Sequence, residues 1–313
     1  MAKAELTVIL PKMASLVQQE INQNIFPETL KKVLNKASFI PDETTLERSL
    51  LNHFSDDIST HTDLPLAALR SEDKNVICAD PCYLHPDRDQ LLLFSDSLQI
   101  TSEEADELIT VIQPLLTDFG AVLTKHNNDQ WVISLESMPE LDFTALPEVT
   151  NKAVQHYLPT GDEQTRLAWL RLWNEIQMLL FDLPLNEKRQ QQGKLPINSL
   201  WFWGKGMINV KPHAWQQVVG NNTLLQTLAE RTNVAHQINI DEAKMSLIIG
   251  KRLIVFEPLD LEGQWQEQLD NVEQVLVKLW QKLKWKKLAK VTIEIPNFGN
   301  YQLTTFDCWK PWS

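Results

Sequence analysis

The carboxyl-terminal half of the chain alternates between strand-type and helix-type segments. Apolar runs rich in branched and aromatic residues are followed by amphipathic stretches of helical period. Parallel strands need a long crossover connection, which is usually a helix, so this alternation favours a mainly parallel sheet with helices on its faces. The segments are SLWFWG, NTLLQTLAERT, RLIVFEPL, the helix Gln264 to Lys284, and KVTIEI. We therefore predict an α/β protein.

The amino-terminal part begins in the same way, and a different module follows it. Residues 6–10 form a short apolar run of strand type, and residues 29–37 form an amphipathic helix. Between residues 75 and 140 we expect a β-rich module in which PCYLHPDRD is a turn between two short strands. Its covering helix begins at Thr101, because Glu104 three residues later completes a capping box. A long helix over residues 165–181 has one apolar stripe.

Composition restricts the partners that we expect. Hydrophobic residues make up 43% and charged residues 22% of the 313 residues, a range typical of globular proteins. The net charge of −12 repels phosphate backbones and anionic bilayers, so we expect neither a nucleic acid nor a membrane partner. In contrast to this negative average, six lysines lie in the segment from Lys278 to Lys290. They form either a solvated helix face or an anion site.

Apolar runs and cysteines indicate a cytoplasmic protein. No apolar run approaches the ~18 residues of a membrane span, and the opening MAKAELTVILPK breaks at Pro11 before a signal-peptide core can form. Three cysteines form no even disulfide framework. Cys78, Cys82 and His85 are spaced like a partial zinc site but lack a fourth ligand. We predict no metal ligand, no catalytic residue and no cofactor.

The block from Asn186 to Gly206 is the best candidate for a ligand site. Its buried strand leads into two glycines, as expected where a strand leaves an open α/β sheet at the ligand-binding edge. A tight turn beneath a tryptophan-rich core is the alternative. Arg189 and Lys194 could hold a small anion such as phosphate, or they could be exposed loop charges. The candidate ligand-binding residues are Asn186, Arg189, Lys194, Asn198, Trp201, Trp203, Gly204 and Gly206.

Acidic residues after RLIVFEPL are a second candidate. Asp260, Glu262 and Asp270 follow a strand of the predicted parallel sheet, where metal ligands are often found. However, no histidine has a matching spacing. Negative charge near a helix N-terminus is favourable, so we interpret these carboxylates as solvated helix-start residues.

Four ordered segments resemble the bacterial RpfE-type regulatory proteins, a family often labelled cofactor-independent phosphoglycerate mutase. The segments are ADPCYLHPDRDQLLL, ITSEEADEL, WNEIQMLL and LPLNEKRQQQGKLPINSLWFWGKG. That family is similar to archaeal-type cofactor-independent phosphoglycerate mutases of the alkaline phosphatase superfamily. The resemblance implies an alkaline-phosphatase-like core, here residues 1–72 and 190–313. It also implies a smaller inserted α+β domain, here residues 73–189, whose long helix returns to the core.

The resemblance further implies two metal ions and a serine nucleophile, and their expected positions can be compared with this sequence. An aspartate ligand is expected after the first strand, where Pro11 and Lys12 stand. The histidine of a later D-E-A-G-H motif is replaced by Gln264, and an expected Asp-His pair by Pro296–Gly299. A two-metal site needs its ligands to hold the ions about 4 Å apart.

We therefore predict a non-catalytic, cytoplasmic regulatory or binding protein of RpfE type, a degenerate relative of the mutases. Its partner would be a small anionic ligand or another protein. Two alternatives stay open. One is an active phosphoglycerate mutase or related metal-dependent phosphoryl-transfer enzyme. The other is a subunit whose exposed tryptophans dock a partner protein, since aromatic residues are enriched at interface hot spots. The sequence indicates no oligomeric state.

Overall fold

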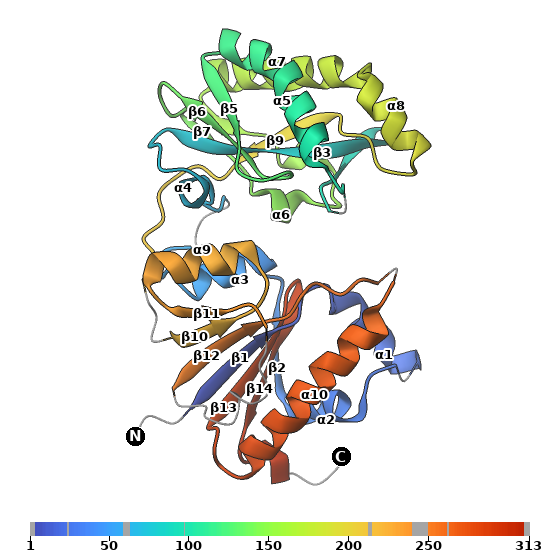
Figure 1. Cartoon of the computed structure of the whole chain (residues 1–313), viewed down its shortest axis with the longest axis vertical. Coiled ribbons are helices and arrows are strands. Elements are labelled where there is room, and N and C mark those ends of the chain that lie inside the picture. The colour runs from blue at the N-terminus through green and yellow to red at the C-terminus, as the bar shows by residue number, and fades with distance from the viewer. Residues whose placement is uncertain are drawn as a thin grey trace. The chain divides into compact units, whose positions relative to one another are not determined.

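The computed structural model describes residues 4–23, 25–58, 63–96, 98–211, 215–239, 250–261 and 263–309. It divides into two compact units (Figure 1). The first, which we call the core unit, combines residues 1–56 and 210–313. The second, the inserted unit, comprises residues 57–209. The two units are of similar length.

The core unit is built on a seven-stranded sheet of order β11-β10-β12-β1-β13-β14-β2. The first five strands in this order are parallel, and β14 and β2 are antiparallel additions at one edge. The predicted α/β class and mainly parallel sheet are confirmed. The strands are β1 (Glu5–Ile9), β2 (Ser38–Asp42), β10 (Trp215–Val219), β11 (Ala235–Gln237), β12 (Lys251–Val255), β13 (Lys290–Ile295) and β14 (Phe298–Thr304).

Helices cover both faces of this sheet (Figure 1). One face carries α3 (Leu46–Asn52) and α9 (Thr223–Thr232), and the other carries α1 (Ala14–Gln23), α2 (Glu28–Lys36) and α10 (Trp265–Lys284). Successive strand residues point to opposite faces. Leu6, Val8 and Ile254 accordingly pack into the core beneath α10 and α2. None of the described helices has the length and apolar character that crossing a bilayer requires.

The inserted unit contains an antiparallel sheet of order β4-β3-β6-β5, and β9 pairs with β3. Its strands are β3 (Val76–Asp87), β4 (Gln90–Phe94), β5 (Ala121–Lys125), β6 (Trp131–Leu135) and β9 (Ser199–Trp203), with β7 (Leu141–Asp142) and β8 (Thr160–Gly161) forming a separate pair. Its helices are α4 (Ala67–Arg70), α5 (Ser102–Asp118), α6 (Leu146–Val149), α7 (Glu163–Phe181) and α8 (Pro184–Gln191).

Two helix predictions for the inserted unit are confirmed. Helix α5 begins with the predicted capping box, in which the Glu104 backbone N–H donates to Thr101 Oγ1 at 3.2 Å and the Thr101 N–H donates to Glu104 Oε2 at 2.9 Å. The long amphipathic helix is α7, which buries Trp169, Trp173 and Ile176.

Two strand predictions are wrong. The segment that contains Pro81 is not a turn but part of the twelve-residue strand β3. Proline is tolerated there because β9 pairs with residues 78–82 on one side, whereas the other side has no partner between residue 78 and residue 83. The second error concerns β9, which belongs to this antiparallel sheet and not to the parallel sheet. The two compact units of the structure meet in sequence at residues 56 and 209, whereas the expected domain boundaries are at 72 and 190.

Candidate functional site

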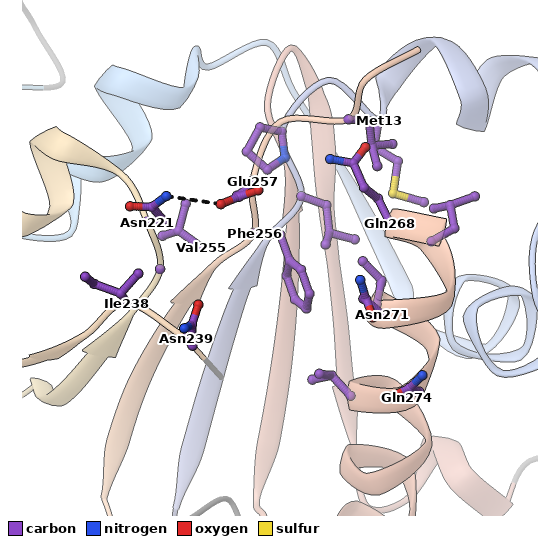
Figure 2. Close-up of a pocket in the computed structure, with 17 residues that line it drawn as sticks. Met13, Asn221, Ile238, Asn239, Val255, Phe256, Glu257, Gln268, Asn271 and Gln274 are labelled. Carbon is purple, nitrogen blue, oxygen red and sulfur yellow. Dashed lines mark hydrogen bonds between the residues drawn. The ribbon is translucent and has the colours of Figure 1, made fainter. Parts of the chain in front are cut away.

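A pocket of about 340 Å³ lies at the carboxyl edge of the parallel sheet in the core unit. The ends of β1, β10, β11 and β12 contribute to it, and α10 forms its other wall (Figure 2). Open α/β sheets bind ligands in the crevice outside the carboxyl ends of their strands, and ligand pockets usually start at about 300 Å³. Both the position and the size of this pocket are typical of a small-molecule site.

The pocket has an apolar floor and a rim of amides. Among its described lining residues there is no lysine, arginine or histidine, and Glu257 is the ionisable one. The floor includes Leu10, Met13, Val255, Leu259, Leu269, Val272 and Val275. The rim amides are Asn221, Asn239, Gln268, Asn271 and Gln274. This lining can make several hydrogen bonds to a ligand but supplies no cation to bind a phosphate.

Tight loops position the polar groups on the strand side of the pocket. Asn221 Nδ2 donates to Glu257 Oε1 at 3.2 Å, which links the loops after β10 and β12 (Figure 2). Gly220 has φ +149, and a Cβ there would lie 2.3 Å from the carbonyl oxygen of Val255. A glycine is therefore required where the first loop passes over β12.

Amides of α10 complete the rim on the helix side. Gln268 is held by the loop before the helix, because its Oε1 accepts from the Asp260 backbone N–H at 2.7 Å. Asn271 and Gln274 are exposed on the following turns. These two side chains face solvent-accessible space, where a ligand can reach them.

Residues other than aspartate and histidine stand at the positions where the resemblance implies metal ligands. Pro11 lines the pocket after β1. Gln264 is exposed at the N-cap of α10 and makes no capping hydrogen bond through its side chain. Strand β13 turns directly into β14, so Pro296 and Asn297 form a two-residue hairpin turn with φ +61 at Asn297.

The described residues contain no group of three or more histidine, cysteine, aspartate or glutamate side chains that could hold a metal ion. Asp260 and Asp270 are exposed, but Asp260 precedes α10 and Asp270 lies beyond its first turn, whose acidic residue is Glu267. Glu262 lies outside the described residues. In β3, His85 is three residues from Cys82, so strand alternation puts it on the opposite face from the two cysteines.

A second polar cluster, which the sequence analysis missed, joins α3 to β13. Glu294 accepts from Ser49 Oγ at 2.7 Å and lies 3.0 Å from His53 Nε2. In a nucleophilic triad, the histidine would contact the serine and activate it. Here the carboxylate contacts both, so the cluster holds the helix against the sheet and does not generate a nucleophile.

The predicted block from Asn186 to Gly206 belongs to the inserted unit, whereas the pocket belongs to the core unit. Asn186 is buried, donates to the carbonyl of Ile197 at 2.8 Å and accepts from its N–H at 2.8 Å. Arg189 is 1% exposed. Its Nη1 donates to Glu104 at 2.7 Å, its Nε donates to the Leu195 carbonyl at 2.8 Å, and its Nη2 also donates to a backbone carbonyl.

Asn198 and Trp201 are likewise engaged within the inserted unit. The Asn198 amide exchanges two hydrogen bonds with the backbone of Leu84, at 2.7 and 2.9 Å. Trp201 is buried and donates from Nε1 to the Thr144 carbonyl at 2.9 Å. Both side chains therefore link β9, or the residue just before it, to neighbouring strands and loops by hydrogen bonds.

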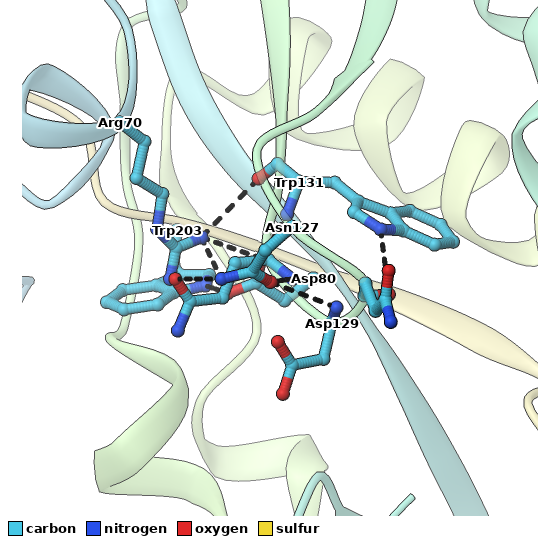
Figure 3. Close-up of polar contacts among 8 residues, drawn as sticks. Arg70, Asp80, Asn127, Asp129, Trp131 and Trp203 are labelled. Carbon is cyan, nitrogen blue, oxygen red and sulfur yellow. Dashed lines mark hydrogen bonds and ion pairs between the residues drawn. The ribbon is translucent and has the colours of Figure 1, made fainter. Parts of the chain in front are cut away.

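Trp203 belongs to a buried charge network centred on Asp80 (Figure 3). Asp80 is 2% exposed and accepts from Arg70 Nη1 at 2.7 Å, from the Trp131 backbone N–H at 2.8 Å and from Trp203 Nε1 at 2.9 Å. The Arg70 guanidinium lies 5.2 Å from the Trp203 ring centroid. Burial alone would lower the pKa of Arg70, but the charge and hydrogen bond of Asp80, together with the nearby Cys78 and Asp129, outweigh burial and raise that pKa.

The glycines and Lys194 complete the predicted set. Gly204 has φ +81, and a Cβ there would lie 2.6 Å from Cys78 Sγ, so the site requires glycine. Burial strongly raises the pKa of the Cys78 thiol, which keeps it uncharged and unreactive. Gly206 is exposed and Lys194 is half-buried. Ligand binding by this block stays a prediction, and the structure adds that most of its polar atoms already have protein partners.

The pocket residues were the ones that the sequence analysis did not single out. Asn221 directly follows Gly220 at the end of β10, and Glu257 follows the buried end of β12. Polar residues just after buried strands were a usable signal. The sequence does not reveal this signal clearly, because β10 and β11 do not have the pattern of predicted strands. The acidic residues further along the loop after β12 are the more conspicuous candidates.

No protein-family model matches the chain. A probable 2,3-bisphosphoglycerate-independent phosphoglycerate mutase from Geobacter sulfurreducens is 29% identical over 131 residues, which cover 39% of this chain and 31% of that protein. The corresponding mutase from Methanosarcina barkeri is 35% identical over 68 residues, 21% of this chain and 16% of that protein. The chain is similar to cofactor-independent phosphoglycerate mutases.

That similarity has a limited extent. The aligned segment spans about a third of the Geobacter protein and less of the Methanosarcina one. Among solved structures, the PH0037 protein from Pyrococcus horikoshii has a TM-score of 0.47 at 13% identity, covering 96% of this chain and 87% of that one. The cofactor-independent phosphoglycerate mutase from Thermoplasma acidophilum has a TM-score of 0.42 at 12% identity, covering 97% and 90%.

Proposed function

We propose that this protein is a non-catalytic small-molecule binding protein of regulatory type, with an alkaline-phosphatase-like core that does not carry out metal-dependent phosphoryl transfer. The observation that carries the proposal is the lining of the carboxyl-edge pocket. The lining residues that the structure describes are amides, apolar side chains and one carboxylate, where a two-metal site would need several carboxylates and histidines.

The lining also indicates the charge of the ligand. A phosphate ester would meet Glu257 and no lysine, arginine or histidine among the described lining residues, in a chain of net charge −12. Taking a phosphate out of water without a cationic partner is costly. An uncharged or cationic polar ligand, such as a sugar, a nucleoside or an amine, fits the amides and the apolar floor better.

Thermal stability with matched pairs of ligands tests this proposal. A sugar is compared with its phosphate ester, and a nucleoside with its monophosphate, in buffer without phosphate. We expect at least one uncharged or amine-bearing compound to raise the melting temperature, since a ligand that binds only the folded state stabilises it. The phosphorylated partner of each pair should have a smaller effect.

Variants locate the binding. Asn271→Ala and Asn221→Ala should remove the ligand-induced shift, because each deletes an amide of the pocket rim. Asn174→Ala, an exposed asparagine of α7, is the matched control and should keep it. Stabilisation by the phosphorylated compounds alone, or a shift that survives both rim variants, would contradict the proposal.

Phosphoglycerate mutase activity is the second candidate function. The similarity to proteins named as such mutases supports it. The geometry of the described residues does not, because Pro11, Gln264 and the hairpin turn at Pro296 stand where the resemblance implies metal ligands.

A further inference from the structure

One end of the core unit carries lysines interleaved with exposed aromatic side chains. It lies at the carboxyl end of α10, where α2 and the short helix η3 (Asp307–Trp309) approach (Figure 1). This is the edge opposite to the pocket, because α10 runs antiparallel to the strands that it covers. We call it the basic-aromatic surface, and it consists of Lys32, Lys36, Trp280, Lys284, Trp285, Lys286, Lys287, Phe306 and Trp309.

Three of the four aromatic residues of this surface are unusually exposed. Trp285 is 74% exposed, Phe306 82% and Trp309 64%. Single exposed apolar residues are normal, but several large ones gathered at one end mark a contact surface. Phe306 and Trp309 are joined by a backbone hydrogen bond, and Trp309 lies against the last turn of α10.

Lysine cations lie directly over the tryptophan rings. Lys284 Nζ is 5.0 Å from the ring centroid of Trp309, and Lys32 and Lys36 Nζ are 6.0 and 5.9 Å from that of Trp280. These distances are within the range of cation–π attraction. Charge and aromatic area are therefore mixed over the same surface and not separated into two patches.

Positive charge at this end is crowded. Burial lowers the pKa of Lys282, and the charges of Arg252, Lys287 and Lys278 lower it further. Basic residues in the last turn of a helix are stabilised by the helix dipole, which accounts for Lys282 and Lys284. The dipole does not account for Lys286 and Lys287 beyond the helix, nor for the exposed aromatic residues.

The composition of the surface distinguishes between kinds of partner. Its exposed cations are lysines, whereas arginine is the usual residue for recognising nucleic-acid phosphates and is enriched in protein interfaces, from which lysine is depleted. Tryptophan at a water–lipid boundary together with lysine is typical of proteins that lie on a bilayer. Lysine stems also cover apolar surface while their ammonium groups reach the headgroups.

We propose that the basic-aromatic surface docks reversibly on an anionic lipid bilayer, with Trp285, Phe306 and Trp309 entering the headgroup region. The net charge of −12 does not prevent this contact, because in salt of physiological strength charges act over about 8 Å. The average charge of the chain, from which we expect no membrane partner, does not describe the charge at one end of a unit.

Vesicle flotation with the full chain tests the proposal. Vesicles of phosphatidylcholine with phosphatidylserine are compared with phosphatidylcholine alone. We expect binding to the anionic vesicles that falls as salt is added, and a blue shift of tryptophan fluorescence on binding. Absence of phosphatidylserine-dependent binding would overturn the proposal.

Matched variants test the surface itself. Lys286→Gln with Lys287→Gln should lower partitioning roughly twenty-five-fold, because each lysine near an anionic surface contributes about fivefold. Lys74→Gln with Lys188→Gln changes the net charge equally at exposed positions of the inserted unit and should have little effect. Equal losses in the two double variants would contradict the assignment of this surface.

A matched pair of variants tests the role of the aromatic residues. Trp285→Ala should weaken vesicle binding and reduce the fluorescence shift, whereas Phe181→Ala, at a residue that is 77% exposed in the inserted unit, should do neither. A single-stranded RNA oligonucleotide is the competing probe. Lysine-dependent binding of that probe without binding to anionic vesicles would show that the surface serves nucleic acid and that the proposal is wrong.

Discussion

At the scale of single residues, Asp80 is where the interactions of the inserted unit converge. Its buried carboxylate receives hydrogen bonds from a guanidinium, a backbone N–H and an indole N–H, which come from α4, β6 and β9. A buried carboxylate without such partners would be strongly unfavourable. The three segments are therefore held in place partly because Asp80 must be satisfied.

Replacing Asp80 by asparagine should be strongly destabilising. The Asp80→Asn variant leaves Arg70 buried without an anionic partner and turns an amide N–H₂ toward other donors. We expect a loss of about 3–5 kcal/mol in the free energy of unfolding, measured by urea denaturation. Asp106→Asn removes an ion pair to Lys125 in which the aspartate is 63% exposed, and it should cost less than about 1 kcal/mol. Similar losses in both variants would contradict the central role of Asp80.

Single residues also show why a ligand site is difficult to predict in the block from Asn186 to Gly206. Arg189 and Trp203 were singled out correctly as unusual residues, since a basic residue and a large aromatic next to glycines suggest function. Their partners, Glu104 and Asp80, lie far away in the sequence. A single sequence does not show which distant carboxylate will neutralise an arginine, so structural and ligand-binding roles could not be separated.

At the scale of elements, β9 shows the same limit. Its identity as a strand was predictable from SLWFWG, because five consecutive buried positions favour a fully covered strand. Its partner was not, because the pattern of a buried strand is the same in a parallel and in an antiparallel sheet. Helices with a strong period, such as α7 and α10, were predictable to within two residues.

The end of β9 offers a test at this scale. Gly204→Ala should be more destabilising than Gly193→Ala by about 1–3 kcal/mol, the usual cost of overpacking a core. Both glycines have a positive φ, of +81 and +73, so both variants include the strain of that conformation. Only Gly204 is packed against Cys78, whereas a Cβ at Gly193 meets open space. Equal melting temperatures for the two variants would show that this packing is not tight.

At the scale of the whole molecule, the sheet of the core unit has a pocket at its carboxyl edge, and the described residues there are not the metal ligands that the resemblance implies. The class of fold was predictable, because strand and helix alternate visibly along the chain. The pocket was not, because its residues come from four strand ends and one helix that are separated by the whole inserted unit. Two strands that contribute to it, β10 and β11, are short and only partly apolar, which leaves little pattern to detect.

Because the chain is similar to phosphoglycerate mutases, the binding of metal ions distinguishes between the two candidate functions. An active mutase must hold two ions close together near the carboxyl edge, and chelation would abolish its activity. A binding protein with an amide-lined pocket would need neither. The two functions therefore make opposite predictions for the same purified sample.

The most direct measurement is the metal content of the untagged protein together with its mutase activity. The protein is incubated with Mn²⁺, Mg²⁺ or Zn²⁺, freed of unbound ions, and assayed for interconversion of 3- and 2-phosphoglycerate. We predict no stoichiometric metal and no conversion above a sample without protein. Stoichiometric bound metal, with conversion that is lost on chelation and restored by adding the ion back, would contradict the account.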